Sequence, residues 1–259
     1  FSKEGSRLTL LDLSFNGVGE GGAKAIADVL SQPSALLRKL NLTGNDLGKD
    51  GCAHLSAMLQ LNASLETLTL ARCGICSEGA ELLAQGILQN HTLQHLDVGR
   101  NSVGAAGASA LLGVTRANSY LHTLNLQDNG LDTTAGVQMA AALTGSIDGL
   151  PVLWRFDGGP AEGVAGGDGE KPLGARFSLK PQGCVEDVDT PGGSLLRHLN
   201  LRHNSLGSAG SASLLAAISA GTRIQTLSLA WNGLGMGAAM ALAGLFSPTS
   251  RCILQELDL

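Results

Sequence analysis

Three glycines near the start of the chain have the spacing of a dinucleotide-binding loop. Gly17, Gly19 and Gly22 form a Gly-x-Gly-x-x-Gly phrase, in which small residues let the backbone approach a pyrophosphate. Such a site also needs an acidic residue about twenty positions later to bind the ribose hydroxyls, but Lys39 and Leu40 lie near that place. A similar turn recurs along the chain with other residues. We therefore interpret the phrase as a structural turn and expect no cofactor.

Two other pairs of residues have spacings that could support chemistry. Cys73 and Cys76 are spaced like a redox dithiol, and His91 and His95 are four residues apart, as zinc ligands on a helix would be. The cysteines fall where the chain places small residues, and His95 falls in an expected strand, so the helical ligand geometry fails. The serines and histidines form no nucleophile-elbow phrase. We predict that the chain has no catalytic site and no metal site, and that it is not an enzyme.

A recurring phrase, Leu-x-x-Leu-x-Leu-x-x-Asn-x-Leu, predicts the secondary structure in which these residues lie. Copies with conservative variants start at Leu8, Leu37, Leu65, Leu93, Leu121, Leu196 and Ile224, and an eighth copy starts at Leu254. The asparagine position is occupied by Asn16, Asn45, Cys73, Asn101, Asn129, Asn204 and Asn232. Successive asparagine positions are 28 or 29 residues apart, except for a step of 75 residues between Asn129 and Asn204. A fixed period of this length is typical of a stacked-repeat solenoid.

This phrase resembles the leucine-rich repeat, and its period resembles that of the ribonuclease-inhibitor subclass. The resemblance covers most of the chain apart from residues 148–195. It implies an α/β fold, a right-handed leucine-rich-repeat solenoid shaped as an arc or horseshoe. A parallel β-sheet would line the concave face, and helices would cover the convex face.

The residues of each copy fit this architecture independently. Alternate side chains of a strand face opposite ways, so the leucines at the fourth and sixth positions point together into the core. Parallel neighbours need a crossover connection, usually helical, and Gly51, Leu55 and Leu59 lie four residues apart on one helix face. The asparagine follows the strand, where its amide can satisfy backbone groups left unpaired by the bend.

Composition excludes several classes of function. The net charge of −5 argues against a protein that binds nucleic acid by bulk charge. No apolar run is long enough to span a membrane, and no secretory signal opens the chain. The 5 cysteines are an odd number and are scattered, which favours a reducing, cytoplasmic setting. A cytoskeletal location within the cell is compatible with the same features.

The step of 75 residues divides the predicted solenoid. We expect repeats 1–5 in residues 1–147 and repeats 6–8, the last one truncated, in residues 196–259. Residues 148–195 would form an insertion, with a degenerate repeat and a Gly-rich mobile loop. Both ends of the sequence interrupt the pattern, so we expect it to be a fragment of a larger protein with a single solenoid.

The eighth position of each copy is the strongest candidate for contact with a partner. Its side chains vary freely in size and charge, as expected of a recognition surface, and in a concave sheet they would face solvent. The predicted partner-binding residues, some from neighbouring positions, are Phe15, Arg72, Arg100, Asp128, His198, Arg202, His203 and Trp231. Arg72 and Arg100 would lie on adjacent strands, and His198, Arg202 and His203 would form a second cationic group. Exposed aromatic residues such as Trp231 are enriched at interface hot spots.

These features predict a non-catalytic scaffold that binds a protein partner through the concave sheet face. Three alternatives stay open: a structural subunit of a cytoskeletal or ciliary assembly, a sensor or autoinhibitory repeat array of an innate-immune receptor, and a small-GTPase-activating regulator. Each would act as part of a larger assembly. The sequence does not discriminate among them.

Overall fold

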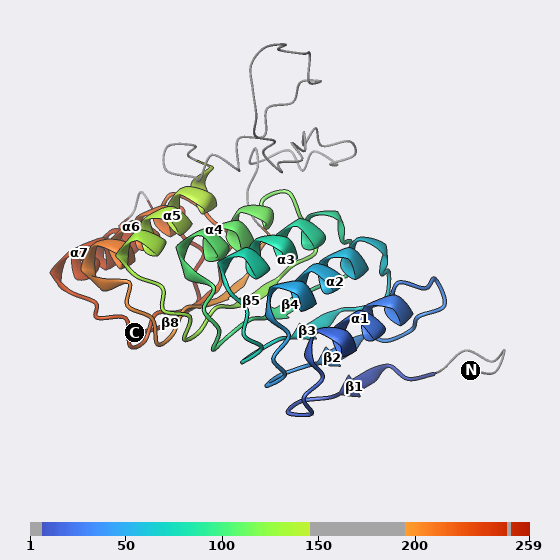
Figure 1. Ribbon diagram of the computed structural model, residues 1–259. Coiled ribbons are helices and arrows are strands. Elements are labelled where there is room, and N and C mark those ends of the chain that lie inside the picture. The colour runs from blue at the N-terminus through green and yellow to red at the C-terminus, as the bar shows by residue number, and fades with distance from the viewer. Residues whose placement is uncertain (1–6, 146–194, 248–249) are drawn as a thin grey trace, which may run out of the picture.

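The computed structural model describes residues 7–145, 195–247 and 250–259, where eight short strands alternate with seven helices (Figure 1). The strands are β1 (Leu10–Asp12), β2 (Lys39–Asn41), β3 (Thr67–Thr69), β4 (His95–Asp97), β5 (Thr123–Asn125), β6 (His198–Asn200), β7 (Thr226–Ser228) and β8 (Glu256–Asp258). The helices are α1 (Gly19–Leu30), α2 (Gly48–Leu61), α3 (Ser77–Gln89), α4 (Gly104–Val114), α5 (Thr133–Thr144), α6 (Gly207–Ser219) and α7 (Met236–Leu245).

All eight strands of the described residues form one parallel sheet in sequence order, from β1 to β8. Each strand pairs with the next in equivalent register, so Leu40, Leu68 and Leu96 lie opposite one another. These leucines point from the sheet toward the helices and are at most 1% exposed. Leu11 and Leu257, on the two edge strands, are only partly buried. The predicted solenoid is confirmed, and its core is one continuous stack of leucines.

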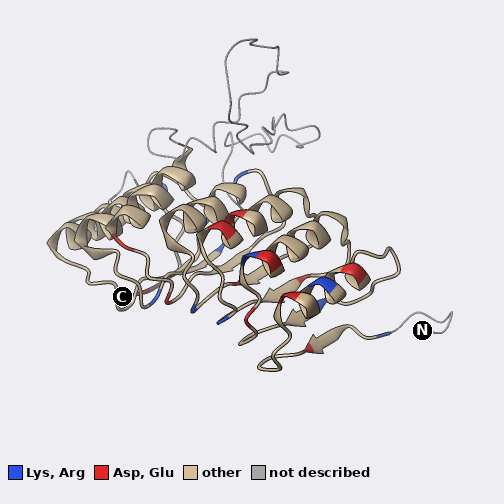
Figure 2. Ribbon diagram, in the orientation of Figure 1, with Lys and Arg blue, Asp and Glu red and all other residues tan. Residues whose placement is uncertain are grey.

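The helices form a second layer that covers one face of the sheet (Figure 1). Small residues set how closely they stack. A Cβ atom added to Gly136 of α5 would lie 2.6 Å from the Cα atom of Gly210 in α6, so no larger residue fits there without separating the helices. Helices α4, α5, α6 and α7 contain no charged residue (Figure 2).

The long step between copies five and six does not interrupt the sheet. Strand β5 pairs directly with β6, and Leu124 lies opposite Leu199 in the usual register. The predicted degenerate repeat and Gly-rich loop lie outside the described residues. The division into residues 1–147, 148–195 and 196–259 therefore stays a prediction.

A ladder of asparagine side chains holds the turn that follows each strand. The Oδ1 atom of Asn45 accepts hydrogen bonds from the backbone N–H groups of Asn16 and Val18, at 3.0 and 2.9 Å. Its Nδ2 atom donates to the carbonyls of Leu13 and Leu42, at 2.9 and 2.8 Å. One side chain thus serves four backbone groups in two neighbouring copies, as the sequence predicted.

Cys73 interrupts this ladder because a thiol cannot replace both ends of an amide. Its Sγ donates to the carbonyl of Leu42 at 3.1 Å, but it provides no acceptor for the previous copy. The N–H of Asn45 bonds instead to Leu42 of its own copy at 3.3 Å, and the N–H of Leu47 bonds to the backbone carbonyl of Cys73 at 3.0 Å. Burial raises the pKa of the Cys73 thiol to about 11, so the proton that it donates is retained at neutral pH.

A second asparagine ladder joins the loops that lead from the helices back to the strands. Asn62, Asn90 and Asn118 are buried. The Nδ2 atom of Asn118 donates to the carbonyls of Ile87 and Asn90 at 2.7 and 2.8 Å, and that of Asn90 donates to Asn62 in the same way. The repeat phrase did not predict this ladder. It joins neighbouring copies at the helix-to-strand loops, whereas the first ladder joins them at the strand-to-helix turns.

We expect Asn101→Ala to lower the free energy of unfolding by about 2–4 kcal/mol, because four backbone groups would lose a partner at roughly 1 kcal/mol each. Those groups are the N–H groups of Cys73 and Ile75 and the carbonyls of Leu70 and Val98. Urea denaturation followed by circular dichroism measures the change. Asn16→Ala is the matched control, since its amide is exposed and donates only to Ser14. Equal losses in the two variants would contradict the ladder.

Cys73→Asn should raise the free energy of unfolding by about 1 kcal/mol at pH 7, because the amide restores the missing acceptor. The free energy of unfolding of the unaltered chain should fall above pH 9, where the Cys73 thiol ionises in the unfolded state. In the Cys73→Asn variant this fall should be smaller. The folded-state pKa of Cys73, about 11, lies above the ordinary thiol value of 9.0 because the thiol is buried. The thiol therefore stabilises the fold below pH 9, and this contribution is lost as the pH rises toward 11. Denaturation at pH 7, 9 and 10.5 tests both parts. An unchanged slope with pH would contradict the assignment to Cys73.

Candidate protein-binding site

The turn after each strand places one residue in the left-handed backbone region. Phe15, Arg72, Arg100, Asp128, His203 and Trp231 have φ between 54° and 62°, and Gly44 has φ of 72°. We call these seven residues the left-handed row. They contain six of the predicted partner-binding residues, but they lie beyond the ends of the strands, not on them.

A hydrogen bond explains why the backbone takes this conformation. The N–H of Arg100 donates to the carbonyl of Gln127 at 2.7 Å, and the N–H of Arg72 donates to that of Gly99 at 3.1 Å. The left-handed residue therefore adds one backbone hydrogen bond to each pair of neighbouring strands. After it, the chain turns toward the helices. For any residue but glycine this conformation costs about 1–2 kcal/mol. Glycine would favour the turn, yet most of the row carries a large side chain.

Those side chains project into solvent and meet their neighbours across the row. Phe15 is 67% exposed and Trp231 is 70% exposed. The Phe15 ring covers Gly44, where an added Cβ would lie 2.3 Å from Cδ1. The rings of His203 and Trp231 are stacked, with centroids 5.4 Å apart and planes at 13°. The row thus presents an aromatic group at each end of the described solenoid.

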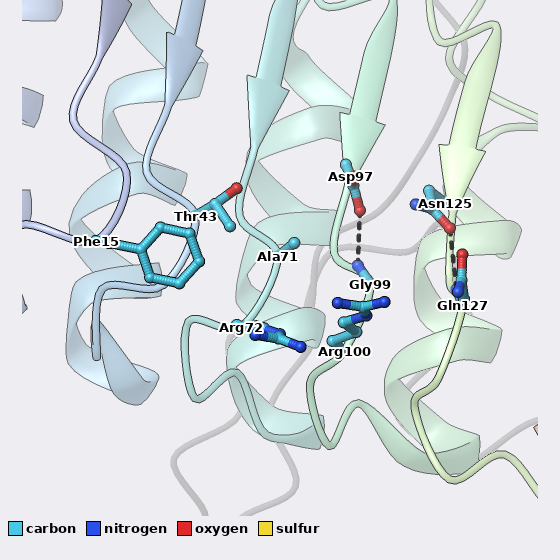
Figure 3. A pocket seen from close by; sticks show the side chains of 9 residues that line it. All are labelled: Phe15, Thr43, Ala71, Arg72, Asp97, Gly99, Arg100, Asn125 and Gln127. Carbon is cyan, nitrogen blue, oxygen red and sulfur yellow. Dashed lines mark hydrogen bonds between the residues drawn. The ribbon is translucent and has the colours of Figure 1, made fainter. Parts of the chain in front are cut away.

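Between these groups lies a hollow of about 240 Å³, lined by Phe15, Thr43, Ala71, Arg72, Asp97, Gly99, Arg100, Asn125 and Gln127 (Figure 3). Ala71 and Gly99 precede the two arginines, and their small size leaves the space open. Asp97 and Asn125 hold the strand ends, because their Oδ1 atoms accept from the N–H groups of Gly99 and Gln127 at 2.8 and 3.0 Å. Arg72 and Arg100 line the opposite side.

The three residues predicted as a second cationic group do not act as one cluster. His198 lies on β6, and its Nδ1 atom is 3.0 Å from the hydroxyl of Thr226. Arg202 is 3.9 Å from a carboxylate oxygen of Asp258. His203 lies past the strand and stacks on Trp231. The alternation of the strand and the turn that follows it point these side chains to different neighbours.

Several residues of this surface were missed by the sequence analysis. Asp97 and Gln127 line the hollow, and His95 faces Thr123 with its Nδ1 atom 2.9 Å from the hydroxyl. Desolvation lowers the pKa of His95, and the nearby charges of His122, His198 and Lys39 lower it further. The signal for the hollow was the small residues at the seventh position of copies three and four, which leave room beside the arginines.

In the residues that the structure describes, no group of three or more histidine, cysteine, aspartate or glutamate side chains could hold a metal ion. The ring of His91 lies tilted against that of Tyr120, with centroids 5.3 Å apart and planes at 60°, while His95 lies on the sheet. Among the same residues, no helix is long and apolar enough to cross a membrane.

The repeats can be compared with known proteins. A family model described as Leucine Rich repeat matches residues 7–27, 34–56, 61–84, 89–112, 117–140 and 194–215. These segments cover more than half of the chain, which therefore belongs to the leucine-rich repeat family, with repeats of the ribonuclease-inhibitor type.

The similar proteins include both short and long relatives. Mouse ribonuclease inhibitor is 32% identical over 148 residues, which are 57% of this chain and 32% of that protein. Human NACHT, LRR and PYD domains-containing protein 13 is 30% identical over 146 residues, 56% of this chain and 14% of that protein. The tropomodulin C-terminal domain of Caenorhabditis elegans aligns with a TM-score of 0.44 and 13% identity, over 53% of this chain and 83% of that one. The chain spans less than a third of the length of these two sequence relatives.

The positive φ angles of the left-handed row strain the backbone of every residue except glycine. Replacing a residue of the row by glycine should therefore stabilise the fold. We expect Arg100→Gly to be more stable than Arg100→Ala by about 1 kcal/mol, since both remove the arginine and only glycine relieves the backbone strain. Urea denaturation of both variants measures the difference. The reverse order would contradict the assignment of strain to this position.

Proposed function

We propose that this chain is a scaffold that binds a protein partner through the concave sheet face and the left-handed row. The observation that carries the proposal is the row itself. Six positions at which the backbone favours glycine hold phenylalanine, arginine, aspartate, histidine or tryptophan instead. These side chains contribute little to the buried core, because they point into solvent. They are suited to contacts outside the chain, and the strain that they impose supports a role in binding.

The distribution of charge favours the same face over the helical one. Helices α4 to α7 carry no charged side chain (Figure 2), whereas Arg100, Asp128, Arg202 and Asp258 belong to the sheet and its turns in this half of the solenoid. Electrostatic complementarity contributes specificity and association rate at protein interfaces. Charged and aromatic side chains on the concave side could therefore both contribute to specificity for a partner.

Capture of partners by the immobilised chain, with quantitative mass spectrometry, tests the proposal. We expect the double variant Trp231→Ala, Arg100→Glu to lose at least one partner that the unaltered chain binds, because it removes an exposed aromatic ring and reverses a charge on the row. The matched control is Met240→Ala, Lys24→Glu, which removes an exposed apolar side chain of α7 and makes the same change of charge on α1. Retention of every partner by the Trp231→Ala, Arg100→Glu variant, or the same losses in the control variant, would contradict the proposed face.

A second candidate is that these repeats form the sensor or autoinhibitory array of a larger multidomain protein. It is favoured by the similarity to NACHT, LRR and PYD domains-containing proteins, such as human protein 5, which is 34% identical over 154 residues but of which the chain spans only 13%. The sequence of the full-length transcript tests this candidate, because it shows which segments flank the repeats. A NACHT segment beside the repeats would support this candidate, and its absence would remove it.

A further inference from the structure

Arg72 and Arg100 place two positive charges beside one another without an ion-pair partner. They occupy equivalent positions on neighbouring copies, whose strands are about 4.8 Å apart, and both line the same hollow (Figure 3). Across residues 7–145, 195–247 and 250–259, the ion pairs involve other side chains. The arrangement thus combines like-charge repulsion with backbone strain at both positions.

Nothing in the fold requires an arginine at either position. Gly44 occupies the same place one copy earlier and donates the same backbone hydrogen bond, to Ala71 at 2.8 Å. The arginine side chains therefore oppose the stability of the turn in two ways, and an anion bound between them would remove the repulsion.

The hollow has room for such a group. Ala71 and Gly99 leave open space next to the arginines, and Phe15 forms one wall. A guanidinium group is planar and donates hydrogen bonds in a fork that matches a carboxylate. Two of them on adjacent copies can each donate hydrogen bonds to one carboxylate.

We propose that the hollow binds a carboxylate side chain, glutamate or aspartate, of the partner protein. The inference rests on the proposed function and names the chemistry that the partner presents. Arg72 and Arg100 would hold the carboxylate, and the methylene groups of the partner residue would lie against Phe15 and Ala71.

The charge of Asp97 favours a carboxylate over a phosphate. Asp97 lies three residues before Arg100, roughly 10 Å along the chain, and lines the same hollow. The two arginines and this aspartate sum to one positive charge. One carboxylate neutralises the hollow, whereas a phosphate dianion would leave it negative.

The test is a titration of the isotope-labelled 259-residue chain, followed by NMR of the arginine Nε–H groups and the Gly99 amide. The probe is N-acetyl-glutamate α-amide, which carries a single carboxylate, and the matched neutral probe is N-acetyl-glutamine amide. We expect saturable shifts at Arg72, Arg100 and Gly99 with a Kd of about 1 mM, as for a small fragment, and none with the neutral probe.

Three variants sharpen the measurement. Arg72→Gln and Arg100→Gln should each weaken binding by about three- to fivefold, as expected for loss of an exposed ion pair. Asp97→Asn should tighten it by about two- to threefold, since it removes a repelling charge. Its fold should be unchanged, because Asn41 and Asn125 make the same backbone hydrogen bond in other copies. Arg223→Gln, an exposed arginine elsewhere, is the control and should not alter binding.

Absence of shifts, or equal shifts with the neutral probe, would overturn the inference. A response to inorganic phosphate without one to the glutamate probe would overturn the carboxylate assignment in favour of a phosphorylated segment. In either case, loss of a captured partner from the Trp231→Ala, Arg100→Glu variant would leave the proposed function standing. If that variant also retains its partners, both proposals fail.

Discussion

The turn after each strand can exist only because the next copy supplies hydrogen-bond partners for it. In the turn that contains Phe15, the side-chain amide of Asn45 accepts from Asn16 and Val18. The backbone carbonyl of Thr43 accepts from Phe15 itself, at 2.7 Å. An isolated copy would lose these hydrogen bonds, each of which contributes about 1 kcal/mol. Stacking therefore satisfies the polar backbone and buries the leucines at the same time, and neither gain is available to one copy alone.

The side chains that stabilise the stack differ from those that we propose for recognition. Residues that face the neighbouring copy, such as Leu68 and Asn101, are fixed by the core and by the ladder. Residues of the left-handed row are constrained only in their backbone, since their side chains point into solvent. Arg72, Arg100 and Trp231 can thus vary without disturbing the stack, apart from the strain that each non-glycine residue adds. If the row binds a partner, as we propose, its specificity can change by substitution at one position of the repeat.

Much of the fold could be predicted from the sequence because each copy has the same residue types at the same spacing. The leucines of the phrase are core residues in the inner copies, as predicted, whereas Leu8 and Leu259 in the first and last copies are 50% and 53% exposed. The asparagines satisfy backbone groups of the turn, also as predicted. Asn62, Asn90 and Asn118 were overlooked, because the phrase that defines the repeat ends before the helix-to-strand loop. The consequence of Cys73 depends on tertiary structure, since Asn45 and Leu47 change their hydrogen-bond partners around it.

The sequence by itself determined the period, the alternation of strand and helix, and which leucines are buried, because these depend on contacts that recur identically in every copy. It also identified most of the exposed row. Only the tertiary structure decided how the row is divided: Phe15 over Gly44, Arg72 beside Arg100 around a hollow, and His203 stacked on Trp231. These contacts join particular side chains of different copies, so they depend on the register between strands and on the direction of each turn. They also depend on β6 following β5 in the sheet, although 75 residues separate Asn129 from Asn204.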